Sequence, residues 1–274
     1  MSPMNHYSID RNTLHLAVAR EEKIPLVIAT AWGDNGGEAS NFSILPTLQQ
    51  YAEYCYANGE DHTWLSKRFK ETYGIKFEDF MLLDTPNIPS NFDLAQQDHR
   101  YAKHFLYNDS LGGWLDFDVK EQYSGEYAQM AEALSKVPAN EFSYIFKASE
   151  MLCRLLALKA TLSLDIRTAY HAKNNEALKE IASNRIPATI TAVDNPYDSY
   201  TRGLTAMLRI SLNEECIARI LDGMELRTCM VEEINLYAGF CGMLTLEIFG
   251  SAGDTAAGNF KECYNSDMIS FATQ

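Results

Sequence analysis

A continuous apolar run near the start of the chain, LVIATA at residues 26–31, most constrains what this sequence can fold into. Strands that are buried on both faces have such unbroken apolar runs, and they belong to parallel sheets covered by helices. Helical patterns flank the run: residues 12–23 predict one helix, and a second begins near Asn41 or Ser43 and continues through Cys55. The first 60 residues therefore predict a helix–strand–helix piece of an α/β fold.

From residue 62 onward the apolar periodicity is helical and strand signals nearly vanish. The longest pattern, residues 141–172, keeps one apolar stripe over about eight turns and predicts a single helix. Gly74 follows a helical pattern as a C-terminal cap. Further helices are expected at 118–135, 174–186, 198–222 and 225–249. We therefore expect a mostly α chain with an α/β piece at residues 1–60 and a helical domain at residues 61–274.

Composition and charge exclude several classes of partner. The 274 residues are 46% hydrophobic and 22% charged, with a formal net charge of −14. Such a negative field repels nucleic-acid phosphates and anionic lipid, so neither nucleic acid nor membrane is expected as a partner. The six cysteines form no Cys-x-x-Cys pair and the six histidines no His-x-x-x-His pair, so no metal and no cofactor is predicted. The start of the chain has no signal-peptide pattern, and a cytoplasmic location is expected.

The loop after the predicted strand, WGDNGGEAS at residues 32–40, is the candidate ligand site. Residues two apart in extended chain face the same side, so Trp32 and Asp34 would project together at the carboxyl end of the strand. An aromatic ring beside a carboxylate suits a sugar, whose C–H groups lie on the ring while its hydroxyls donate to the carboxylate. The alternative is that Trp32 packs in the core and Asp34 serves a turn. The glycine spacing is neither a dinucleotide fingerprint nor a phosphate loop.

Several stretches resemble one enzyme family. IATAWGDNGGEASNFSILPTLQQYAEYCY looks like the eighth barrel strand and following helix of family 20 glycoside hydrolases, in the β-N-acetylhexosaminidase branch with a C-terminal helical domain. The resemblance continues through LSKRFKETYGIKFEDFMLLDTPN, KHFLYNDSLGGWLD and SEMLCRLLALKATLSLDIRTAYHAKNNEALKEIA. It covers residues 2–183 well, weakens after them, and does not extend beyond about residue 235.

The resemblance implies a retaining exo-glycosidase that removes terminal β-linked N-acetylglucosamine or N-acetylgalactosamine on a (β/α)8 barrel. The substrate's own 2-acetamido oxygen is then the nucleophile. By similarity, Trp32 would wall the −1 sugar pocket, Asp34 would bind a sugar hydroxyl, and Glu38 is a lesser candidate. The family's catalytic Asp-Glu pair has no counterpart, and no Asp-Glu dipeptide occurs. The chain resembles the last helix–strand–helix of the barrel plus the helical domain, with no catalytic residues of its own.

Two readings of the function stay open. In the first, the chain is the C-terminal segment of such an enzyme, and by itself it hydrolyses nothing. In the second it is a non-catalytic helical packing or dimerisation module, with a homodimer through the helical domain as the candidate assembly. Tyr107, Asn108, Asp109 and Trp114 form a polar-aromatic cluster that either reaches a sugar site or packs between domains. Since a strand needs neighbours on both edges, residues 1–60 are expected to be loosely held or to self-associate.

Overall fold

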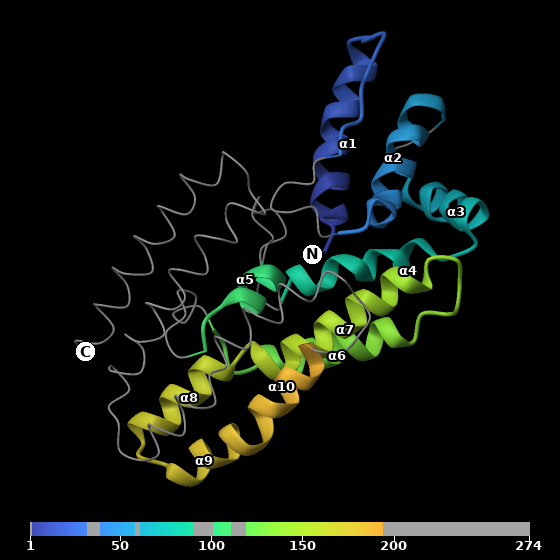
Figure 1. Ribbon diagram of the computed structural model, residues 1–274. Helices are drawn as coiled ribbons and strands as arrows, with labels where there is room; N and C mark the ends of the chain where they lie inside the picture. Colours follow the sequence, from blue (N-terminus) through green and yellow to red (C-terminus); the bar gives the residue numbers. More distant parts are fainter. Residues whose placement is uncertain (1, 32–38, 58–60, 90–100, 111–118, 194–274) are drawn as a thin grey trace, which may run out of the picture. The chain divides into compact units, whose positions relative to one another are not determined.

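The computed structural model describes residues 2–31, 39–57, 61–89, 101–110 and 119–193, and these are mostly helical (Figure 1). The prediction of a mostly α chain is confirmed for this part. Trp32, Asp34, Glu38 and Trp114 lie outside the described residues, as do the helices expected at 198–222 and 225–249.

The chain divides into two compact units that do not follow its order. One unit contains Met1–Lys103 and Glu126–Cys153, and the other contains His104–Gly125 and Arg154–Gln274. The expected domain boundary near residue 60 stays a prediction.

The first unit begins with a run of short helices. These are α1 (Asn5–Glu21), the 3-10 turn η1 (Asn41–Ile44), α2 (Leu45–Tyr56), α3 (His62–Tyr73), α4 (Phe77–Met81) and the 3-10 turn η2 (Leu82–Asn87). Local signals set their ends: the Asp61 carboxylate accepts from two backbone N–H groups at the start of α3, and Gly74 ends that helix with a φ of 71°. The predicted C-terminal glycine is therefore confirmed, because glycine adopts this left-handed conformation without strain.

The remaining helices continue through both units. They are α5 (Tyr101–Tyr107), α6 (Tyr123–Ser135), α7 (Ser143–Lys159), α8 (Leu162–His171), α9 (Asn175–Glu180), the π-helical turn η3 (Ile181–Arg185) and α10 (Ile186–Val193). The helix expected at 118–135 starts at Tyr123, and the Asn174 side chain caps α9 by accepting from the N–H of Ala177.

The strand predicted at residues 26–31 is not confirmed by this structure. No strand forms anywhere in the described residues, and Leu26 and Ile28 are each 72% exposed. A strand exists only when a neighbouring strand takes up its backbone N–H and C=O groups. The described part of the chain offers no such neighbour, so the apolar run remains an exposed segment beside α1 (Figure 1).

The first helix also differs from its prediction. It begins at Asn5 rather than Asn12, and the side chains of Leu14 and Val18, expected on a packing face, are each 58% exposed. Polar side chains of α1, Asn5 and Thr13, bond to α2, and Leu16 is buried, whereas Leu14 and Val18 lie on the exposed side of the helix.

The single helix predicted for residues 141–172 is two helices, α7 and α8, with a break at Ala160 and Thr161. Polar groups at the break compete with continued helix. Arg185 Nε donates to the Leu158 carbonyl over 2.8 Å, and the guanidinium also contacts Thr161 and Asp165. The apolar stripe is continuous through the break, so periodicity could not reveal it.

An aromatic cluster forms the core of the first unit. Phe80 is fully buried, and its ring lies 5.4 to 5.5 Å from the rings of Phe69, Phe142 and Phe146 in edge-on arrangements. These contacts join α3, α4 and α7, and edge-to-face packing adds to the burial of apolar area.

Replacing Phe80 with alanine is expected to lower the free energy of unfolding by about 3–5 kcal/mol, because it empties a fully buried ring site. The matched control is Tyr144→Ala on α7, where the side chain is 50% exposed and the loss should be below about 1 kcal/mol. Urea unfolding followed by circular dichroism measures both, and similar losses in the two variants would contradict this account of the core.

Candidate functional site

The candidate sugar loop, residues 32–38, is attached at its C-terminal end to a well-held segment. The Ser40 side chain accepts from the N–H of Phe42, which starts η1, and the Ser43 hydroxyl donates to the Ser40 carbonyl over 2.6 Å. Ser43 is 1% exposed. The chain that leaves the loop therefore enters a buried, hydrogen-bonded turn.

A carboxylate from η2 holds the start of α1. Asp84 is 1% exposed, and its Oδ2 accepts from the backbone N–H of His6 over 2.7 Å and lies 2.8 Å from His6 Nδ1. The first N–H groups of a helix have no partner inside the helix, and the helix dipole favours a negative charge there. Met4, the residue at the cap position, supplies no side-chain cap. Asp84 therefore caps α1 from 78 residues away in the sequence.

Asn5 links this cap to the segment that follows the loop. Its side chain is fully buried, and Nδ2 donates to Asp84 Oδ1 over 3.1 Å and to the Ser43 carbonyl over 2.9 Å. Thr47 in α2 donates to Asn5 Oδ1 over 2.9 Å. The Asn5 amide thus uses both of its donors and its acceptor, and it joins α1, η1, α2 and η2 at one point.

The contact between α1 and α2 continues as a line of polar groups. Gln50 Nε2 donates to the Ile9 carbonyl over 3.0 Å and to Thr13 Oγ1 over 2.7 Å. Further along, the Arg20 guanidinium donates to the Tyr54 and Ala57 carbonyls over 2.5 and 3.1 Å and so covers the end of α2. Hydrogen bonds therefore hold α1 and α2, the helices before and after the candidate loop, against each other.

A shallow hollow lies beside the cap. It is lined by Pro3, Met4, His6, Tyr7, Asp84, Asn87 and Ile88, and it has room for about one water molecule. It cannot hold a sugar ring. This cluster therefore has a positioning role. It holds α1 and α2, which precede and follow the loop that carries Trp32 and Asp34 in the sequence.

Sequence reasoning missed Asn5 and Asp84. Asp84 stands in LLDTPN, where a carboxylate predicts only a helix-start charge, and Asn5 precedes the stretch that was expected to be helical. Their contact spans 79 residues, and no local pattern signals such a pair.

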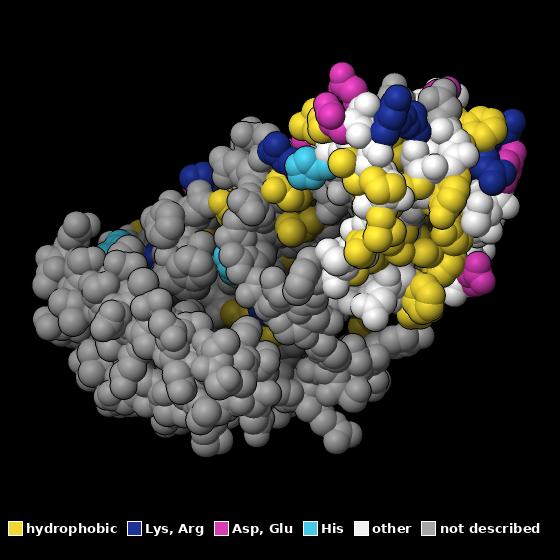
Figure 2. All heavy atoms as spheres, turned by 90° about the horizontal axis from the view of Figure 1, so that it is seen from above, with side chains coloured by type: hydrophobic (Ala, Val, Ile, Leu, Met, Phe, Trp, Pro, Cys, Tyr) yellow, Lys and Arg dark blue, Asp and Glu magenta, His cyan; other side chains and the backbone are white. Residues whose placement is uncertain are grey.

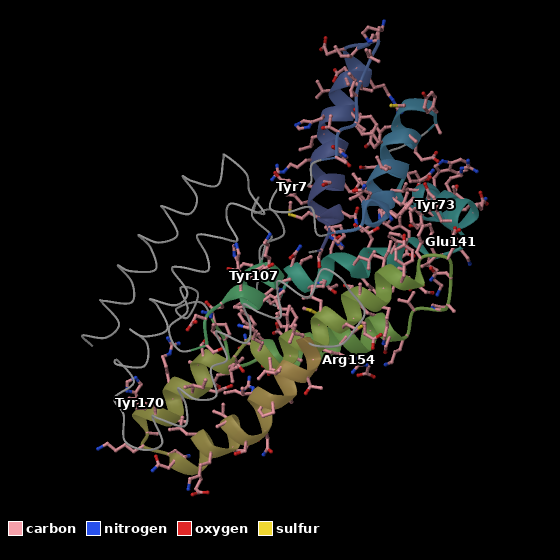
Figure 3. The ribbon with its side chains drawn as sticks, in the orientation of Figure 1. Tyr7, Tyr73, Tyr107, Glu141, Arg154 and Tyr170 are labelled. Carbon is pink, nitrogen blue, oxygen red and sulfur yellow. The ribbon has the colours of Figure 1, made fainter. Side chains whose placement is uncertain are left out.

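The second candidate cluster lies at the end of α5. Asn108 and Asp109 are 4% and 3% exposed, and Tyr107 is half-buried. Figure 3 labels Tyr107 on α5. The buried ammonium of Lys159, at the end of α7, donates to the Asn108 carbonyl. Three of the four residues of this cluster are consecutive at the end of α5, and one of them, Asn108, contacts the buried cation; Trp114 lies outside the described residues.

Of the cysteines in the described residues, Cys153 on α7 is completely buried and Cys55 on α2 is exposed. Burial, together with the nearby Glu150 carboxylate, raises the pKa of the Cys153 thiol to about 12. A thiol held in this neutral state is a poor nucleophile and packs as a small apolar side chain.

Residues 78–207 match the family model described as the glycoside hydrolase 20C C-terminal domain. This segment is similar to the C-terminal part of family 20 glycoside hydrolases. The resemblance inferred from the sequence is thereby confirmed for the C-terminal part of such an enzyme. No curated protein matches the chain.

Several of the polar residues described above lie inside the segment that matches the family 20 model. Asp84, Tyr107, Asn108, Asp109 and Lys159 lie inside the matched residues, whereas the candidate sugar loop precedes them. Among the described residues no group of three or more His, Cys, Asp or Glu side chains could hold a metal ion. In the same part of the chain, every helix is too short or too polar to cross a membrane.

Replacing Asp84 with alanine is expected to lower the free energy of unfolding by about 2–3 kcal/mol, because three buried or half-buried donors lose a charged acceptor. Asp10→Ala is the control, since that carboxylate is 67% exposed and should contribute below about 0.5 kcal/mol. Asp84→Asn keeps one acceptor and should fall between the two. Chemical unfolding measures all three, and equal stability of Asp84→Ala and Asp10→Ala would show that the cap is unimportant.

The raised pKa of Cys153 makes stability depend on alkaline pH. Because the folded-state pKa lies near 12 and the ordinary value is 9.0, the folded state favours the protonated thiol. The resulting stabilisation is complete below about pH 9 and is lost as pH rises toward 12, by about 1 kcal/mol per pH unit. The stability advantage of wild type over Cys153→Ala should therefore shrink between about pH 8.5 and 10.5 in reducing buffer.

Cys55→Ala is the matched control, since its thiol is exposed. Its stability difference from wild type should not change over the same pH range. A Cys153→Ala difference that stays constant as pH rises would contradict the assignment of a neutral buried thiol.

Proposed function

We propose that the chain is the C-terminal segment of a retaining exo-β-N-acetylhexosaminidase that acts on terminal β-linked N-acetylglucosamine or N-acetylgalactosamine. The observation that carries this proposal is the family 20 C-terminal domain at residues 78–207, which follows the loop WGDNGGE in the chain. Asp84, inside that domain, contacts the helix before the loop and, through Asn5, the turn after it. These contacts hold together the segments that precede and follow the candidate sugar loop in the sequence.

Residues 1–60 are, in this proposal, the last helix–strand–helix of a (β/α)8 barrel, and residues 61–274 are the helical domain. Three features support the barrel assignment: α1 and α2 flank the run 26–31 in the expected order, the run carries no helical hydrogen bonds, and its apolar side chains are exposed. A strand of a complete barrel would bury those side chains and pair its backbone on both edges.

Within such a barrel the chain supplies part of the −1 sugar pocket. The Trp32 ring would stack on the C–H face of the sugar, and the Asp34 carboxylate would accept from its hydroxyl groups. Glu38 would support the loop. The cleavage step, attack by the substrate's 2-acetamido oxygen with an acid from an Asp-Glu pair, needs residues that this sequence does not contain. The substrate is an amino-sugar glycoside, no cofactor takes part, and the location is cytoplasmic.

The cluster at the end of α5 is the second proposed point of contact with the sugar. Tyr107, Asn108, Asp109 and Trp114 would act at the rim of the pocket of the same molecule or of a partner subunit. The buried Lys159 ammonium, which holds the Asn108 carbonyl, fixes the backbone at this point.

The second candidate function is a non-catalytic helical packing or dimerisation module. The finding that favours it is that the described residues of the matched domain form helices and no strand. Sugar binding at Trp32 separates the two functions.

The experiment is indole NMR of the 15N-tryptophan-labelled chain, whose three signals are assigned with single Trp→Phe variants. Adding methyl N-acetyl-β-glucosaminide should shift the Trp32 signal, and Asp34→Ala should reduce that shift. The Trp64 signal is the internal control, because its indole N–H is held by Glu53 over 2.8 Å on the far end of α2. The chain should release nothing from p-nitrophenyl N-acetyl-β-glucosaminide above the buffer rate.

A Trp32 signal that is unmoved by the sugar, with a normally folded chain, favours the packing module. Hydrolysis by this chain alone would contradict the part of the proposal that concerns catalysis, because hydrolysis requires a catalytic pair that the sequence does not supply.

A further inference from the structure

The helices α1 and α2 run in the same direction. Near their starts, Thr47 in the first turn of α2 donates to Asn5 Oδ1 over 2.9 Å. At their ends, the Arg20 guanidinium of α1 donates to the carbonyls of Tyr54 and Ala57. Between the two helices the chain runs back beside α1 (Figure 1). The starts of both helices therefore lie at one end of the pair.

The two ends of this pair differ in chemistry. The start holds the Asp84 carboxylate, the Asn5 amide and the His6 imidazole, and the chain leaves the candidate sugar loop there, because Ser43 of η1 bonds to both Ser40 and Asn5. Figure 2 views the molecule from the other end, toward which α1 runs, and shows hydrophobic side chains gathered over the described part of that face. The start of the pair is therefore the end that suits a hydroxyl-rich ligand.

In the proposed barrel this end of the pair belongs to the substrate face. The strands of such a barrel end at the face that holds the active site, and each following helix begins there. The helices form the outer ring, so the first turn of α1 lies further from the barrel axis than the loop that carries Trp32 and Asp34. A side chain in that turn meets the part of the substrate that extends out of the −1 pocket.

Asp84 orients one imidazole ring at this position. His6 Nδ1 lies 2.8 Å from Asp84 Oδ2, and since a carboxylate oxygen only accepts, Nδ1 carries the ring proton. In the neutral ring Nε2 is then a hydrogen-bond acceptor, and the bond at Nδ1 fixes the direction in which it points. The His6 side chain is 40% exposed, so a ligand can reach it.

His6 also lines the shallow hollow beside the cap. The hollow has room for about one water molecule, which is the space that one hydroxyl group needs. Pro3, Met4 and Ile88 supply apolar walls, so the imidazole is a directed partner for a group that enters. A sugar ring that rests outside the hollow can place a single hydroxyl in it.

We propose that His6 binds the sugar next to the terminal N-acetylhexosamine, by accepting a hydrogen bond from one of its hydroxyl groups at Nε2. Asp84 is the positioning residue, because it fixes the tautomer and the direction of the ring. This inference rests on the proposed function and extends it to a second subsite. Trp32 and Asp34 hold the terminal sugar, and His6 favours substrates in which a second sugar follows over those with a simple alkyl aglycone.

The test compares a one-sugar ligand, methyl N-acetyl-β-glucosaminide, with a two-sugar ligand, the methyl β-glycoside of N,N′-diacetylchitobiose. NMR of the full chain labelled with 15N-histidine and 15N-tryptophan follows both sites. Both ligands should shift the Trp32 indole signal, and only the two-sugar ligand should shift the His6 ring signals. His6→Ala should weaken binding of the two-sugar ligand about three- to tenfold, the range expected for one hydrogen bond, and leave one-sugar binding unchanged.

Two further variants separate binding from structure. His15→Ala is the matched control, because His15 is an exposed histidine of the same helix, and it should change neither affinity. The 15N shifts of the His6 ring should place its proton on Nδ1 in wild type and move toward the Nε2–H form in Asp84→Ala. Circular dichroism verifies that each variant keeps the helical content of wild type.

His6 signals that stay unmoved while the two-sugar ligand shifts Trp32 would overturn this inference and leave the proposed function standing. So would a His6→Ala variant that loses equal affinity for both ligands, since that is the effect of a merely structural side chain. A wild-type ring with its proton on Nε2 would also overturn it. A Trp32 signal that neither ligand moves would remove the proposed function and this inference together.

Discussion

The buried carboxylate of Asp84 is the interaction on which the arrangement of the first unit depends. It caps α1 at the His6 N–H, and through Asn5 it reaches the Ser43 carbonyl in η1. A carboxylate at 1% exposure is tolerated only when donors surround it, and here the start of a helix provides them. Asp84, which lies in the segment that matches the family 20 model, therefore holds in place the segments before and after the candidate sugar loop.

The polar contacts between α1 and α2 explain why apolar side chains at this end of the first unit are exposed. Polar groups hold α1 to α2, and several apolar side chains are left for something else to cover: Leu14, Val18, Ile24, Leu26 and Ile28. In the proposed enzyme the cover is the rest of the barrel. This explanation rests on one physical requirement: an apolar run with free backbone groups needs a strand beside it.

The sequence predicted the helical parts well where local signals decide the structure. The Asp61 carboxylate starts α3 and the left-handed backbone of Gly74 ends it, and the family resemblance agrees with the match at residues 78–207. It failed where distant contacts decide. The strand at 26–31 is absent because the described residues contain no partner strand, and α7 stops at Lys159 because Arg185 takes the Leu158 carbonyl. The predicted sugar residues Trp32, Asp34 and Glu38 remain predictions.

Amide hydrogen exchange of the full chain, at a concentration where it is monomeric, tests the central claim most directly. The His6 N–H lies in the first turn of a helix and would ordinarily be unprotected. The Asp84 cap predicts that it exchanges slowly, while the N–H groups of Leu26 to Ala29 exchange at the rate of unstructured chain. A freely exchanging His6, or uniform protection across Leu26 to Ala29 in the monomer, would contradict the account.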